Sequence, residues 1–153
     1  LMKSLLKWWL IFCLTLLGLC TCVYFNIHKD LYAADVTRLS FLIISIFTCT
    51  SIWIGIKTYK VGIQQDYNQK SDVGWFISES CLALGMVGTV TGFLIMLGTA
   101  FANVDVTNAA TLQQALADMA VGMSTALWTT LVGLVSSLII KVQLVNLEVA
   151  LNE

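Results

Sequence analysis

The chain has 153 residues, of which 58% are hydrophobic and only 11% are charged. Soluble chains typically carry about 25% charged residues, so this composition excludes an ordinary soluble globular domain. The formal net charge of -1, from 8 basic and 9 acidic residues, offers no long-range attraction for a polyanion. A nucleic-acid-binding role is therefore excluded.

Two apolar segments in the first half of the chain predict membrane-spanning helices, the first with Lys7 near its start as its single charge and the second with no charge. A helix needs about 20 apolar residues to cross the hydrocarbon core of a bilayer. Residues 5–25 predict the first span, with a signal peptide as the alternative because Lys3 and Lys7 give a basic start. Signal peptides have shorter apolar segments, of about 7 to 15 residues, which favours a retained helix. Residues 39–56 are rich in isoleucine and phenylalanine and predict the second span.

Two further apolar segments follow in the second half of the chain. Residues 76–101 carry a single charge, Glu79, and predict the third span, and residues 119–140 predict the fourth. Thr111 and Gln114 have the Thr-x-x-Gln spacing of a capping box, so the last helix is expected to begin near Thr111, before the membrane. The residues after the fourth span are good helix formers and are expected to continue this helix.

The distribution of basic residues predicts the orientation of the four spans. Cytoplasmic loops of membrane proteins carry an excess of lysine and arginine. With the N-terminus inside, six of the eight basic residues fall on the cytoplasmic side, and only Lys29 and Arg38 fall outside. The sequence therefore predicts an all-α integral membrane protein with four transmembrane helices in one membrane domain and both termini in the cytoplasm.

The ionisable and metal-binding residues do not form a pattern typical of an enzyme. Catalysis needs nucleophiles, acids, bases or metal ligands that converge, and the spans contain almost none. His28 is the single histidine, and the five cysteines lie in or beside apolar segments. We therefore predict no catalytic residue, no metal site and no cofactor. The acidic residues at helix ends and in loops, Glu148 among them, are interpreted as solvated.

Glycines are concentrated in the third and fourth spans. Gly88 and Gly92 are four residues apart, a spacing that lets a second helix backbone approach closely on one face. Such glycines are common in packed membrane helices, so they indicate contact between helices before they indicate function. The residues expected in close helix packing are Gly85, Gly88, Gly92, Gly122 and Gly133.

Hydroxyl-bearing residues form two stripes on the fourth span. Thr130 and Ser137 lie seven residues apart and share one stripe of the helix. The neighbouring stripe carries Thr125, Thr129 and Ser136. Such hydroxyls either bond back to a carbonyl of the preceding turn or line a water-accessible seam between helices.

At these residues the sequence resembles the MotA/TolQ/ExbB proton-channel family. The family's pattern Gly-Leu-Leu-Gly-Thr-Val-x-Gly is similar to Gly-Met-Val-Gly-Thr-Val-Thr-Gly at residues 85–92. The family's last span resembles residues 122–134, which read Gly-Met-Ser-Thr-Ala-Leu-Trp-Thr-Thr-Leu-Val-Gly-Leu. The resemblance covers about residues 80–141, and the four-span layout is similar to the motility branch of the family.

The resemblance implies an assembly and a function. It implies a homopentamer of this chain, in the inner membrane of a bacterium, that encloses two copies of a single-span partner with a transmembrane aspartate. It also implies that Thr89 and Thr130 face the ion path, where a hydroxyl donates and accepts hydrogen bonds without placing a charge in lipid. Further candidates for the pore and its mouths are Thr125, Ser137, Glu79 and Asp118.

Departures from the family pattern argue against a flagellar torque generator. The transport branch often has a glutamate five residues before its last conserved threonine, where this chain has Thr125. The motility branch has prolines beside the pore and a large cytoplasmic domain, whereas this chain has no proline and about twenty residues in its inner loop. We therefore expect the ring subunit of an ion-driven motor or energy transducer. A non-conducting membrane scaffold and a small-solute transporter are the alternatives.

Overall fold

A computed structural model describes residues 2–34, 38–64, 70–102, 104 and 107–152. These residues form helices α1 (Met2–Tyr24), α2 (Ile27–Ala34), α3 (Leu39–Gln64), α4 (Asp72–Ala100) and α5 (Ala109–Asn152), without a strand among them. Four helices, α1, α3, α4 and α5, are long and apolar enough to cross a membrane. The prediction of an all-α fold with four candidate spans is confirmed.

Helix α5 extends far beyond the length needed to cross a bilayer. Its 44 residues span about 66 Å at 1.5 Å per residue, compared with about 30 Å for the hydrocarbon core. It begins two residues before the predicted start at Thr111 and runs on to Asn152, as the helix-forming residues after the fourth span predict. The absence of proline permits this length, because proline interrupts the backbone hydrogen bonds of a helix.

The predicted capping box at the start of α5 is wrong. Asn108 lies just before the helix, and its side-chain oxygen accepts a hydrogen bond from the backbone N–H of Ala110 at 3.0 Å. The Thr111 hydroxyl instead donates to the carbonyl oxygen of Asn108 at 2.8 Å. Asn108 therefore caps the helix, because an asparagine side chain directly before the first turn reaches its free N–H groups.

The short helix α2 was not predicted from the sequence. Asn26 separates it from α1 and has a φ of 57°, a left-handed conformation that asparagine adopts more readily than most residues. The residue thereby turns the chain between the two helices. Helix α2 contacts α5.

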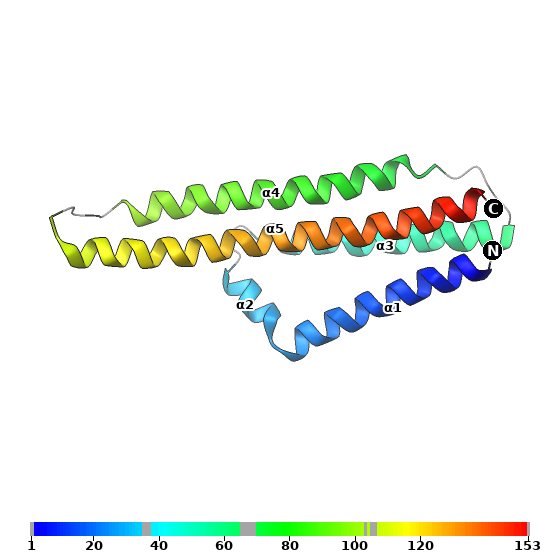
Figure 1. Ribbon diagram of the computed structural model, residues 1–153, viewed down its shortest axis with the longest axis horizontal. Coiled ribbons are helices and arrows are strands. Elements are labelled where there is room, and N and C mark those ends of the chain that lie inside the picture. The colour runs from blue at the N-terminus through cyan, green and yellow to red at the C-terminus, as the bar shows by residue number, and fades with distance from the viewer. Residues whose placement is uncertain (1, 35–37, 65–69, 103, 105–106, 153) are drawn as a thin grey trace.

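Helices α3, α4 and α5 form the central bundle, and α1 diverges from it (Figure 1). Helix α5 contacts both α3 and α4, and its contact with α4 is the most extensive between any two of the described helices. Both termini lie at the same end of the bundle (Figure 1). An even number of spans produces this arrangement.

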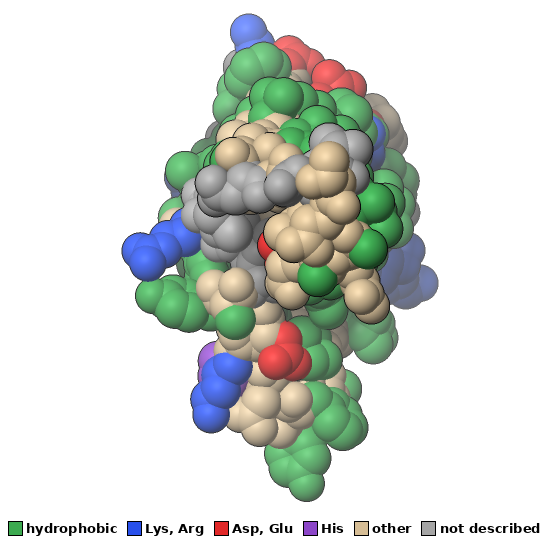
Figure 2. All heavy atoms as spheres, turned by 90° about the vertical axis from the view of Figure 1, so that its left-hand side faces the viewer, with side chains coloured by type: hydrophobic (Ala, Val, Ile, Leu, Met, Phe, Trp, Pro, Cys, Tyr) green, Lys and Arg blue, Asp and Glu red, His purple; other side chains and the backbone are tan. Residues whose placement is uncertain are grey.

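Large hydrophobic side chains are exposed along the spanning helices. Leu14 in α1, Phe76 in α4 and Val121 in α5 are each about 70% exposed. Figure 2, viewed from the end opposite the termini, shows hydrophobic side chains reaching the surface around the outline of the molecule. Apolar patches of this extent are rare on soluble monomers and indicate contact with lipid or with other protein chains.

Helix α1 is attached to the bundle through Trp8. This is the single buried residue among the described side chains of α1. Its ring stacks on Phe12 at 5.2 Å between centroids and covers Gly55 of α3. A Cβ atom at position 55 would lie 2.2 Å from Cζ2 of Trp8, so only glycine leaves room for the indole.

The substitution Gly55→Ala is expected to lower the free energy of unfolding by about 1–3 kcal/mol, the usual cost of overpacking a filled site. The indole must move because the new methyl group occupies its place. Thermal unfolding of the detergent-solubilised chain measures the effect. Gly18→Ala in α1 is the control, since nothing lies within 4 Å of a Cβ atom there. Equal melting temperatures for the two variants would contradict the attachment of α1 through this contact.

Candidate functional site

Helices α4 and α5 pack antiparallel along a row of glycines. Gly74 near the start of α4 meets Leu144 late in α5, and Gly85 meets Gly133 further along. A Cβ atom at position 133 would lie 2.8 Å from the carbonyl oxygen of Cys81 and 2.9 Å from Cα of Gly85. These are backbone atoms, so the two helices are in direct main-chain contact at this point.

The other predicted glycines have side-chain atoms, and not backbone atoms, as their nearest neighbours. A Cβ atom at Gly88 would lie 2.3 Å from the Cγ2 atom of Thr129, and one at Gly122 would lie 2.3 Å from Cγ of Met96, so both face side chains. At Gly92 the nearest atom would be 3.5 Å away, an ordinary van der Waals distance. The closest backbone approach therefore occurs between Gly85 and Gly133 and not at the Gly88 and Gly92 pair.

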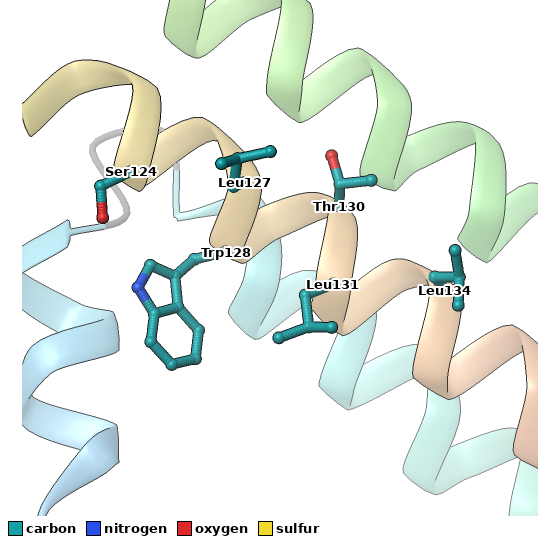
Figure 3. Close-up of a pocket in the computed structure, with 6 residues that line it drawn as sticks. All are labelled: Ser124, Leu127, Trp128, Thr130, Leu131 and Leu134. Carbon is teal, nitrogen blue, oxygen red and sulfur yellow. The ribbon is translucent and has the colours of Figure 1, made fainter. Parts of the chain in front are cut away.

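The hydroxyl groups of Thr89 and Thr130 meet directly across the contact between α4 and α5. The Thr89 hydroxyl also lies 3.0 Å from the carbonyl oxygen of Gly85, and the Thr130 hydroxyl lies 3.4 Å from the same oxygen. Both side chains are half-buried. Figure 3 shows the Thr130 hydroxyl pointing from α5 toward α4. The two hydroxyl oxygens and the Gly85 carbonyl oxygen thus converge within one turn of the glycine contact.

Two arrangements of protons are possible within this threonine pair. In one, Thr89 donates to the Gly85 carbonyl and Thr130 donates to Thr89. In the other, Thr130 donates to the Gly85 carbonyl and Thr89 donates to Thr130. Each hydroxyl has one proton and two lone pairs, so both protons are used internally in either arrangement. The pair is therefore ready to accept a hydrogen bond from another group.

An open hollow of about 410 Å³ lies over α5 beside the threonine pair. Thr130 forms one edge of it, and Trp128 extends to the opposite side, away from α4 (Figure 3). The lining residues are Ser124, Leu127, Trp128, Thr130, Leu131 and Leu134. The threonine pair is therefore reachable from an otherwise largely apolar surface of α5.

Three of the remaining predicted pore residues have described side chains, and none of the three contacts the threonine pair. Ser137 lies two turns further along α5 and is 3% exposed. Glu79 is exposed on α4, and Asp118 is exposed on α5, where its carboxylate accepts a hydrogen bond from Gln114 at 3.1 Å. The side chain of Thr125 lies outside the described part of the structure.

The second hydroxyl stripe of α5 is packed inside the bundle. Thr129 and Ser136 are 1% and 6% exposed. The same seven-residue spacing continues to Gln143, which is fully buried and donates to the Ser51 hydroxyl of α3 at 3.0 Å. The described side chains of this stripe therefore join α5 to its neighbours and do not line an open surface.

The sequence predicts that Glu148 is solvated, and this prediction is wrong. Its carboxylate oxygen Oε1 accepts hydrogen bonds from the Ser71 hydroxyl at 2.7 Å and from the Trp75 indole N–H at 2.6 Å. These bonds fasten the start of α4 to the last part of α5. The sequence carries no local signal for them, because the two donors lie more than 70 residues before Glu148.

Glu148→Leu is expected to destabilise the chain by about 1.5–3 kcal/mol, the range for a hydrogen bond to a charged group, because two donors lose their acceptor. Glu148→Gln keeps an acceptor oxygen and is expected to lose less than half of that amount. Denaturant unfolding measures the free energy of unfolding of these variants. Glu79→Leu is the control, since Glu79 is exposed. A similar loss for Glu148→Leu and Glu79→Leu would contradict the assigned bonds.

Metal-binding side chains are dispersed over the molecule. Among the described residues, no three or more His, Cys, Asp or Glu side chains are grouped so that they could hold a metal ion. All five cysteines are free thiols, and only Cys81 is buried. The chemistry of the α4 and α5 contact therefore rests on hydroxyl and carbonyl oxygens.

Comparison with known proteins identifies the family. The family model of the MotA/TolQ/ExbB proton channel family matches residues 63–152, more than half of the chain. No curated protein and no solved structure matches the chain significantly. The matched region contains all of α4 and α5 and with them the Thr89 and Thr130 pair. The chain is a multi-pass membrane protein and belongs to the MotA/TolQ/ExbB proton channel family.

Proposed function

We propose that the chain is the ring subunit of a proton-driven motor or energy transducer in the bacterial inner membrane. In this proposal five copies enclose two transmembrane helices of a partner protein, each with an aspartate at membrane depth. Family membership supports an ion-channel role coupled to a partner. The observation that carries the proposal is the half-buried hydroxyl pair of Thr89 and Thr130 in the matched region.

The end of the bundle that carries both termini faces the cytoplasm in this proposal. Six of the eight basic residues belong to the parts of the chain that meet there: the start of α1, the end of α3, the start of α4 and the last part of α5. Figure 1 shows these segments together at one end. This distribution matches the excess of basic residues on the cytoplasmic side of membrane proteins.

The threonine pair distinguishes the two charge states of the partner's aspartate. Because both hydroxyl protons are used internally, the pair accepts a hydrogen bond from a protonated carboxyl group without rearrangement. An ionised carboxylate needs a donor and obtains one only when Thr89 or Thr130 turns its proton away from the Gly85 carbonyl or from the other threonine hydroxyl. Arrival of a proton at the aspartate therefore replaces one contact with the threonine pair by another, and this exchange allows the partner helix to move.

The free energy released when one proton crosses the membrane is sufficient for this rearrangement. A charge crossing a membrane potential of 100 mV releases about 2.3 kcal/mol. A neutral hydrogen bond in a folded protein contributes about 0.5–1.5 kcal/mol net. One translocated proton can therefore reset the hydrogen bond between a threonine and the Gly85 carbonyl.

The other polar candidates extend the path to both sides of the membrane in this proposal. Ser137 lies toward the cytoplasmic end of α5 on the stripe of Thr130, but its side chain is buried, so it is a candidate only from its place in the sequence. Glu79 forms the inner mouth, and Asp118 forms the outer mouth. Both carboxylates are exposed, as residues at an aqueous entrance must be. Thr125 remains a candidate from its place in the sequence.

Native mass spectrometry of the gently solubilised chain, co-expressed with its neighbouring genes, tests the assembly. Five copies with two copies of a single-span partner are expected. Proton uptake into liposomes then tests the activity and should require the partner's aspartate. A ring that conducts without any partner would favour the transporter alternative. A complete ring with its partner but no proton uptake would favour the scaffold alternative.

A further inference from the structure

A second open hollow lies between α1 and α5 at the end of the bundle that carries the termini. It has a volume of about 330 Å³. Its lining residues are Lys7, Leu10, Ile11, Val142, Val145, Asn146 and Val149. The walls are apolar apart from one lysine and one amide. The Thr89 and Thr130 pair plays no part in it.

The hollow exists because α1 packs against the bundle over only part of its length. Only 6% of the membrane-spanning part of α1 is buried. The helix diverges from α5 beyond its first turns (Figure 1). Apolar side chains of the two helices therefore line a space that the chain itself does not fill. In a bilayer such a space is filled by lipid chains or by another protein segment.

The positive charge at the hollow favours an anionic occupant. Lys7 lines it, and Lys3 lies one turn earlier on the same face of α1, so the two ammonium groups lie on one side of the helix. Both lysines are exposed, and neither forms an ion pair within the described ranges. Basic pockets between transmembrane helices on the cytoplasmic side are typical binding places for anionic lipid headgroups.

The hollow is an open groove between two diverging helices, so an occupant can extend beyond it along the groove. A helix with side chains is about 10 Å across. An acyl chain is narrower than a helix and follows the apolar wall formed by Leu10, Val142 and Val145.

We propose that this hollow binds an anionic phospholipid of the cytoplasmic leaflet. Lys7 and Lys3 hold the phosphate group, and the Asn146 amide lies on the same wall. The acyl chain runs along Leu10 and the valines of α5 and occupies the space from which α1 diverges. The bound lipid thereby links α1 to α5. This site goes beyond the ion path, and only the choice of leaflet depends on the proposed orientation.

Native mass spectrometry of the full chain in mild detergent tests the site with two probes, phosphatidylglycerol and phosphatidylethanolamine. The chain is expected to retain phosphatidylglycerol in preference to phosphatidylethanolamine. Each lysine near an anionic headgroup contributes about fivefold in affinity, so Lys3→Gln with Lys7→Gln should weaken phosphatidylglycerol binding about 25-fold. Equal retention of the two lipids by the unmodified chain would overturn the proposal.

The double variant Lys60→Gln with Lys70→Gln is the matched control. It removes the same charge from the same end of the bundle, at exposed lysines that do not line the hollow. Phosphatidylglycerol binding should be unchanged in this control. An equal loss in both double variants would mean that diffuse positive charge attracts the lipid, and the proposed site would be wrong.

Val145→Trp tests the apolar part of the hollow without a change of charge. The indole fills the space for the acyl chain and should reduce phosphatidylglycerol retention as strongly as the loss of both lysines. A melting temperature close to that of the unmodified chain shows that the Val145→Trp variant is folded. If it does not fold, Val145→Phe replaces it in the experiment. Undiminished lipid retention in a folded variant would overturn the proposal. The loss of a dimer of the chain without a loss of lipid would also overturn it, because a second copy would then occupy the hollow.

Discussion

Thr130→Val is expected to lower the rate of proton uptake roughly 10-fold to 100-fold while the ring stays assembled. Valine has nearly the shape of threonine, so the packing of α4 against α5 is kept, but the hydroxyl that meets Thr89 is lost. A hydrogen bond to a charged group contributes about 1.5–3 kcal/mol, which corresponds to roughly a 10-fold to 100-fold loss of rate. Proton uptake by proteoliposomes that contain the ring and its partner measures the effect.

Control variants separate the role of this hydroxyl from a general loss of polarity. Thr130→Ser keeps the hydroxyl and should retain most of the activity. Thr91→Val on α4 should be almost silent, because the Thr91 hydroxyl bonds back to the Val87 carbonyl of its own helix at 2.7 Å. Normal proton uptake by Thr130→Val would show that the threonine pair does not face the ion path.

The pair should also behave as one unit. Thr89→Val is expected to reduce proton uptake as much as Thr130→Val does. The double variant should be no worse than either single variant, because each change already removes the same contact between the two hydroxyls. Independent, multiplicative losses would contradict a shared site.

Gly133→Ala is expected to have the largest effect on stability. The new methyl group would lie 2.8 Å from the carbonyl oxygen of Cys81 and 2.9 Å from Cα of Gly85, so the two backbones must move apart. Overpacking of this kind costs about 1–3 kcal/mol, and a backbone contact belongs at the upper end of that range. Thermal unfolding measures the loss. The larger side chain of Gly133→Leu should prevent assembly.

A glycine elsewhere on α4 provides the comparison. Nothing lies within 4 Å of a Cβ atom at Gly98, so Gly98→Ala should not destabilise the chain. The Gly133→Ala variant should also lose proton uptake, because separating α4 from α5 separates Thr89 from Thr130. Equal stability of Gly133→Ala and Gly98→Ala would contradict the close contact of the two helices.

These two experiments together distinguish the proposed motor from a scaffold. Both readings require the glycine contact, so both predict that Gly133→Leu prevents assembly. Only the motor requires the hydroxyls in an assembled ring. A scaffold would tolerate Thr130→Val, since valine preserves the shape of the packed surface.

The sequence by itself determined the number of spans and the region of the candidate site. The spans follow from the length and composition of apolar segments, because crossing a bilayer depends on these properties of the segment alone. The spacing of Thr130 and Ser137 placed them on one stripe, because the helical period is fixed. The family pattern added Thr89, and the structure brings its hydroxyl against that of Thr130.

Tertiary structure alone decided which faces meet and which polar groups are paired. The register of α4 against α5 selected the Gly85 and Gly133 contact, because glycine spacing within one helix does not specify the partner's register. The same register joined Glu148 to donors more than 70 residues earlier in the chain. The hollow beside Lys7 likewise depends on the angle at which α1 leaves the bundle. Contacts between segments distant in sequence set these features, and a local pattern does not contain them.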